Sequence, residues 1–61
     1  MLFNIGDVGR RVLVDGRNWG IVVASGAPGV TVRFERRVRG CERAGNCLFV
    51  PAAEAADRVV S

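Results

Sequence analysis

Apolar and polar residues alternate in several short segments of the chain, and turn-forming residues separate these segments. In one such segment, Val30, Val32 and Phe34 fall on one side of an extended strand, whereas Thr31, Arg33 and Glu35 fall on the other. This period of two predicts a half-buried strand. Further extended segments are predicted at residues 1–5, 8–14, 19–24, 47–50 and 59–60.

Gly, Asp and Pro residues mark the breaks between these segments. An Asp-Gly pair at residues 15–16 is a strong turn signal, and the break at residues 25–29 contains a proline that cannot extend a strand ladder. Pro51 ends the strand before it and suits the first position of a helix. We therefore expect a short helical turn from Pro51 to Ala56, followed by a last short strand.

The segment after Phe34 breaks the alternation. If the strand continues to Arg39, Arg36 points inward unless a bulge or bend turns it outward, and small barrels need such a corner. Residues 40–46 are then expected to form a hairpin loop.

Together these elements predict an all-β fold, a small five-stranded Src-homology-3-like barrel with one late helical turn, as a single domain over residues 1–61. A chain of 61 residues lies near the lower size limit for independent folding, so a staple or a partner subunit would add useful stability.

Three short motifs carry a resemblance to known families. They are GDVGRRV at residues 6–12, WGIV at residues 19–22 and LFVPAAE at residues 48–54. The chain resembles the small barrels that include Tudor-like and ribosomal KOW-type domains. It is also similar to the plasmid-borne trimethoprim-resistant dihydrofolate reductases, which are tetramers of such barrels. The resemblance covers most of the chain, and its short structural motifs imply the fold far more than the function.

The residue types that most enzymes use for chemistry are scarce. The chain has no His, Lys or Tyr, and its hydroxyl groups (Ser25, Thr31 and Ser61) have no ordinary activating base. The six carboxylates are expected to cap, to form turns or to pair with Arg. In the reductases, Gln and Tyr precede the Pro of the matching strand, whereas Leu48 and Val50 stand there in this chain. We therefore expect no enzyme activity and no cofactor, and a reductase-like pore ranks last among the hypotheses.

Two cysteines flank a five-residue loop. Such a loop can place Cys41 and Cys47 opposite each other at a separation that suits a disulfide. In a reducing cytoplasm the pair would instead be two free thiols that serve as small hydrophobic residues. Both interpretations remain open. A zinc site needs four ligands, which only two subunits together would supply, so no metal is expected.

Nine arginines against six acids give a net charge of +3. Several of these arginines are expected along one strand and the loop after it, as a guanidinium stripe that suits the phosphates of DNA or RNA. The members of this stripe are Arg33, Arg36, Arg37, Arg39 and Arg43, with Arg10, Arg11 and Arg17 on a neighbouring strand. Trp19 or Phe49, if exposed, would stack a base beside it. The competing interpretations are a solvated mixed-charge face and a core position for both aromatic residues.

Two function classes therefore lead. The first is a non-catalytic nucleic-acid-binding module that uses the arginine stripe. The second is a protein-interaction or self-assembly module whose apolar face contains Leu2, Phe3, Ile5, Leu48 and Phe49. No Lys or Pro protects residues 1–5 as an edge strand, which favours a homo-oligomer. The sequence has no apolar run of about 20 residues and no secretion signal, so we expect a cytoplasmic protein without a membrane segment.

Overall fold

The computed structural model describes residues 7–60 and contains five strands, one 3-10 turn and one short α-helix. The strands are β1 (Arg11–Val14), β2 (Asn18–Gly26), β3 (Gly29–Phe34), β4 (Cys47–Pro51) and β5 (Val59–Val60). The 3-10 turn η1 (Glu42–Ala44) precedes β4, and the helix α1 (Ala52–Arg58) connects β4 to β5. The strand predicted at residues 1–5 lies outside the described residues.

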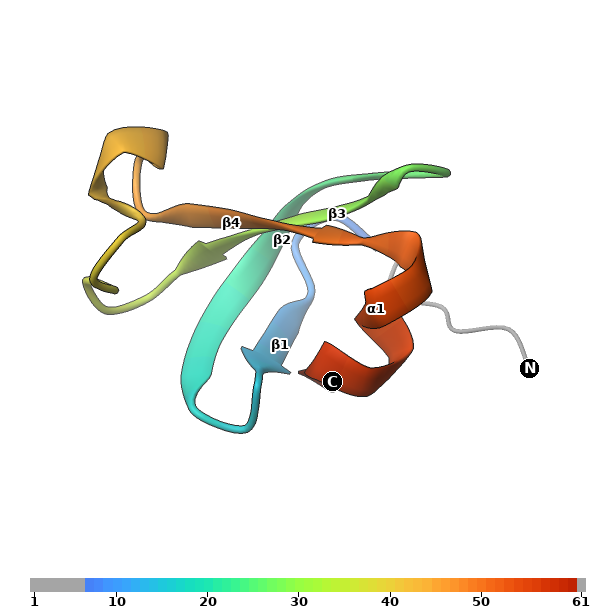
Figure 1. Ribbon diagram of the computed structural model, residues 1–61, viewed down its shortest axis with the longest axis horizontal. Helices are drawn as coiled ribbons and strands as arrows, with labels where there is room; N and C mark the ends of the chain where they lie inside the picture. Colours follow the sequence, from blue (N-terminus) through green and yellow to red (C-terminus); the bar gives the residue numbers. More distant parts are fainter. Residues whose placement is uncertain (1–6, 61) are drawn as a thin grey trace.

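The five strands form one antiparallel sheet in the order β4-β3-β2-β1-β5. The sheet curls into a half-barrel (Figure 1), and α1 packs against β3, β4 and β5. This arrangement confirms the predicted all-β class with one helical turn late in the chain. It is compatible with a small Src-homology-3-type barrel.

Valine fills most of the concave side of the sheet. Six valines are buried almost completely: Val12, Val14, Val22, Val32, Val50 and Val59. Their β-branched side chains suit the pleated surface of a strand, and burying each contributes roughly 1.5 kcal/mol or more. Val30, Phe34, Cys41 and Ala55 of α1 complete this cluster. The inward side of the predicted alternation in β3 is therefore confirmed.

The hairpin between β2 and β3 is tighter than the sequence suggested. Gly26 pairs with Gly29, so the turn consists of two residues, and β2 runs further than expected. Val22 pairs with Val32, whereas Ala24 pairs with Thr31, which leaves Val23 as an extra residue. The bulge that a curled sheet needs therefore lies in β2.

The strand does not continue to Arg39, since β3 ends at Phe34. The side chain of Asn46 holds the departing chain with three hydrogen bonds. Its Nδ2 donates to the carbonyl oxygens of Phe34 at 3.2 Å and Arg36 at 2.8 Å, and its Oδ1 accepts from the amide of Val38 at 2.8 Å. These bonds satisfy backbone groups that a longer strand would have paired, so the chain bends here.

A charged bridge joins α1 to the turn between β1 and β2. Arg58 donates from Nε to Asp15 Oδ1 at 2.9 Å, from Nη2 to Asp15 Oδ2 at 2.8 Å and from Nη1 to Glu54 at 3.2 Å. The amide of Asp15 also donates to the carbonyl of Arg58 at 2.7 Å. The hydrogen bonds from Arg58 lower the pKa of Asp15 below its ordinary value.

This bridge predicts an acid-sensitive stability. A carboxyl group whose pKa is lower in the folded than in the unfolded chain stabilises the fold fully above its unfolded pKa, and the contribution is lost as pH falls through the folded value. We expect the free energy of unfolding to decline below about pH 4. Urea titrations followed by circular dichroism at several pH values measure this decline. Asp15→Asn tolerates the positive φ of 55° and should flatten the pH profile. Parallel profiles for both proteins would contradict the assignment.

Candidate functional site

The convex face of the sheet carries an exposed tryptophan. Trp19 in β2 pairs with Leu13 of β1 and retains 41% of its accessible surface. Of the two interpretations of this ring, the core position is wrong. Its neighbour Gly20 takes the inward position opposite Phe34, and there a Cβ would lie 2.5 Å from Val32 Cγ1. Because successive residues of a strand face opposite sides, an inward Gly20 places Trp19 on the convex face.

Arg11 and Glu35 support the indole ring. The guanidinium carbon of Arg11 lies 4.1 Å from the ring centroid of Trp19, within cation–π distance. Arg11 also donates from Nε to Glu35 Oε2 at 2.6 Å and from Nη2 to Glu35 Oε1 at 3.1 Å. These hydrogen bonds lower the pKa of Glu35 and raise that of Arg11, so both groups stay charged at neutral pH. This bidentate pair holds the guanidinium against the ring.

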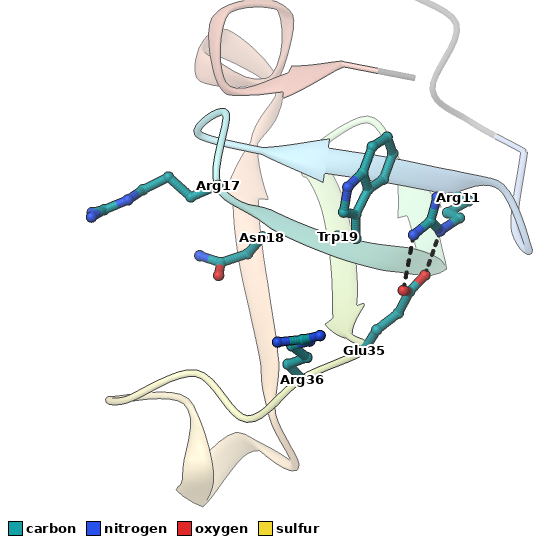
Figure 2. Close-up of a pocket in the computed structure, with 6 residues that line it drawn as sticks. All are labelled: Arg11, Arg17, Asn18, Trp19, Glu35 and Arg36. Carbon is teal, nitrogen blue, oxygen red and sulfur yellow. Dashed lines mark hydrogen bonds and ion pairs between the residues drawn. The ribbon is translucent and has the colours of Figure 1, made fainter.

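The tryptophan forms one wall of a hollow of about 330 Å³ (Figure 2). The hollow is lined by Arg11, Arg17, Asn18, Trp19, Glu35 and Arg36. In Figure 2, Arg11 lies on one side of the indole and Arg17 and Asn18 on the other, with Arg36 below. Three arginines and one carboxylate therefore line the hollow, and that carboxylate is already paired with Arg11; the side chain of Arg17 extends away from the indole in Figure 2.

Hydrogen bonds that involve their backbone atoms position Arg17 and Arg36 at the hollow. Arg17 belongs to the turn between β1 and β2, where its amide donates to the carbonyl of Val14 at 3.0 Å. Arg36 follows the end of β3, and its carbonyl is held by Asn46. Within residues 7–60, neither Arg17 nor Arg36 forms an ion pair. Both cations are therefore available to an anionic ligand.

The remaining residues of the predicted stripe do not line the hollow. Arg33 lies on the convex face of β3, between Ile21 of β2 and Cys47 of β4. Arg37, Arg39 and Arg43 are exposed in the segment between β3 and β4, and Arg43 lies in η1. The stripe is therefore split, because only its first member lies on a strand.

The second candidate stacking residue, Phe49, lies on β4, apart from the hollow. It is 50% exposed, so the competing interpretation of a core position is wrong. It pairs with Thr31. Leu48 and Val50 beside it face the core, Leu48 half-buried and Val50 fully buried. The positions where the reductases carry polar residues are thus interior positions in this half-barrel.

Both cysteines are free thiols. Cys41 is buried in the core cluster, whereas Cys47 is half-buried on the convex face, where it pairs with Arg33. Residues 42–44 form a 3-10 turn, and the amide of Asn46 donates to the carbonyl of Cys41 at 2.8 Å. The expected hairpin with facing cysteines is therefore absent. Within residues 7–60, no cluster of three or more His, Cys, Asp or Glu residues is arranged to hold a metal ion.

The fold and the site together define a small β half-barrel with an arginine-lined aromatic hollow on its convex side. Comparison with protein-family models, with curated proteins and with solved structures yields no match. Of the helices described in residues 7–60, none has the length and apolar character needed to cross a membrane. The case for function therefore depends on the geometry of the hollow.

Proposed function

We propose that this protein is a non-catalytic module that binds nucleic acid through its guanidinium groups. The observation that carries the proposal is the position of Arg17 and Arg36, which line the same hollow as the exposed Trp19 and form no ion pair among the described residues. A guanidinium presents a planar fork of donors that matches phosphate oxygens, and an aromatic ring beside it suits a base.

The ion pairs of the described residues engage only a minority of the arginines. Four of the six carboxylates pair with only three arginines: Asp7 with Arg10, Glu35 with Arg11, and Asp15 and Glu54 with Arg58. Six of the nine arginines then form no ion pair within residues 7–60. They are Arg17, Arg33, Arg36, Arg37, Arg39 and Arg43. Most of the arginines within residues 7–60 therefore lie outside ion pairs.

The salt dependence of binding tests this proposal. We expect the protein to bind a fluorescently labelled single-stranded oligonucleotide in an anisotropy titration, and the logarithm of the association constant to fall linearly with the logarithm of salt concentration. For single strands the slope is about −0.7 for each phosphate contacted, so three or four contacts give a slope of about −2 to −3. A labelled neutral peptide is the control. Absence of binding at low salt would exclude the proposal.

The second candidate function is protein interaction or self-assembly. What favours it is β4, which pairs only with β3 in the described part of the chain and carries the exposed Phe49. An unpaired strand edge beside an exposed aromatic ring suits addition of a strand from a partner, including a second copy. Light scattering distinguishes the two candidates, because oligomers that persist at high salt without affinity for DNA or RNA favour assembly.

A further inference from the structure

The two faces of the Trp19 ring differ in what they contact. One face is covered by the guanidinium of Arg11 at 4.1 Å. The other side of the ring is directed toward Arg17 and Asn18 across the hollow (Figure 2). A planar ligand that enters the hollow would therefore stack on one face of Trp19, while Arg11 covers the other face.

The stack is ordered before any ligand arrives. Arg11 and Trp19 lie on adjacent paired strands. The two carboxylate oxygens of Glu35 accept hydrogen bonds from Arg11 and so hold its guanidinium in place. The amide of Glu35 also donates to the carbonyl of Trp19 at 2.9 Å. A ring held in this way loses little conformational entropy on binding, which favours affinity.

The three arginines of the hollow consequently have different roles. Nε and Nη2 of Arg11 are engaged by Glu35, so this residue is suited to supporting the ring. The guanidiniums of Arg17 and Arg36 have no such partner within residues 7–60 and remain available for phosphate. A ligand with a flat aromatic part and an attached anionic group fits this division.

The size and shape of the hollow favour a single strand over a duplex as its ligand. A volume of about 330 Å³ lies at the lower end of the range for small-molecule sites, which begins near roughly 300 Å³. Bases in a duplex are stacked on one another and offer only their edges in the grooves, whereas a single strand can place a base face against an aromatic ring. The hollow therefore suits one unpaired base.

We infer that the hollow is a binding site for one unpaired nucleobase, which stacks on the face of Trp19 opposite Arg11 while an adjacent phosphate contacts Arg17 and Arg36. The module then prefers single strands to duplex. This inference rests on the proposed nucleic-acid binding and adds the location, the stacking residue and the form of the ligand.

The intrinsic fluorescence of the protein provides a direct test. Trp19 is the only tryptophan and the chain has no tyrosine, so the signal reports on this ring alone. We expect a short oligodeoxyadenylate to quench the fluorescence and to bind about tenfold more tightly than an abasic strand of the same length and charge. The same sequence in a duplex should bind like the abasic strand. A ribo-oligoadenylate is titrated in parallel, and quenching by either strand supports the site.

Two variants locate the stacking surface. Trp19→Ala should remove the difference between the oligodeoxyadenylate and the abasic strand, and Trp19→Phe should restore part of it, as measured by anisotropy of the labelled strands. Phe49→Ala is the matched control, since it removes another exposed aromatic side chain outside the hollow, and it should leave the difference unchanged. Circular dichroism verifies that each variant is folded.

The possible outcomes distinguish the stacking site at Trp19 from nucleic-acid binding in general. Equal affinity for the abasic and adenylate strands, or a loss caused by Phe49→Ala and not by Trp19→Ala, would overturn the stacking site while nucleic-acid binding stands. No affinity for any strand at low salt would overturn the proposed function itself.

Discussion

Gly29→Ala is expected to lower the free energy of unfolding by about 3 kcal/mol or more, from a positive-φ penalty and steric overlap together. Gly29 opens β3 with a φ of 151°, a region that residues with a Cβ rarely adopt. An added Cβ would overlap the carbonyl oxygen of Val50 and lie 2.9 Å from Pro51 Cα. Both are backbone atoms of β4, so relief requires separating β4 from β3. A domain of this length has a total stability of only about 3–9 kcal/mol, so the variant should be largely unfolded.

Gly26→Ala is the matched control for this prediction. Gly26 pairs with Gly29 across the same hairpin, but its added Cβ would meet only Pro28 Cδ at 3.5 Å, an ordinary van der Waals distance. We expect its effect on stability to stay below about 1 kcal/mol. Urea denaturation followed by circular dichroism measures both variants. Similar midpoints for the two variants would show that β4 can accommodate a Cβ at position 29, which would contradict the prediction.

The strands that the sequence predicted well are those in which burial alternates. In β3, Val30, Val32 and Phe34 face the core and Arg33 faces solvent, as a period of two requires. Pro51 also marks the change from β4 to the helix to within one residue: β4 includes Pro51, and the helix runs from Ala52 to Arg58 where a turn from Pro51 to Ala56 was expected. Local chemistry decided these features, so a single sequence was sufficient to predict them.

The position of Trp19 could not be predicted in the same way. The segment from Trp19 to Ala24 is almost continuously apolar, so alternation does not indicate which residues face the core. The decision depends on the close approach of β3 to Gly20, which leaves no room for a side chain there. That close approach depends on how the two strands pair, so the sequence of either strand alone does not predict it.

The supporting residues of the hollow were also beyond local reasoning. Glu35 appeared as an outward position of the predicted strand, yet its partner Arg11 is 24 residues away, and their meeting depends on the register of β1, β2 and β3. Asn46 was assigned to a loop, although its side chain sets the end of β3 and the place of Arg36. Asn46 adopts a positive φ of 64°, which Asn tolerates better than most residues, but the sequence alone does not show this conformation.

The second large effect concerns binding. Replacing both Arg17 and Arg36 by Glu should weaken the affinity for a single-stranded oligonucleotide by about 100-fold at low salt, because two charge-assisted hydrogen-bonding groups are lost and two like charges face the phosphates. The salt dependence should become shallower by about 1.4, the product of two contacts and the slope for each. Anisotropy titrations at several salt concentrations measure both quantities. Neither side chain forms an ion pair within residues 7–60, and Arg17 has only a through-space attraction to Asp15, so circular dichroism should show the variant folded.

The matched control reverses the same number of charges away from the hollow. Arg39 and Arg43 are exposed between β3 and β4, and neither lines the hollow. Arg39→Glu combined with Arg43→Glu changes the net charge by the same amount as the double replacement in the hollow, so both variants lose equal long-range attraction. A contact mechanism predicts that the hollow variant loses far more affinity than the loop variant. Equal losses would mean that the phosphates respond to the overall charge of the protein, and the hollow would then have no special part in binding.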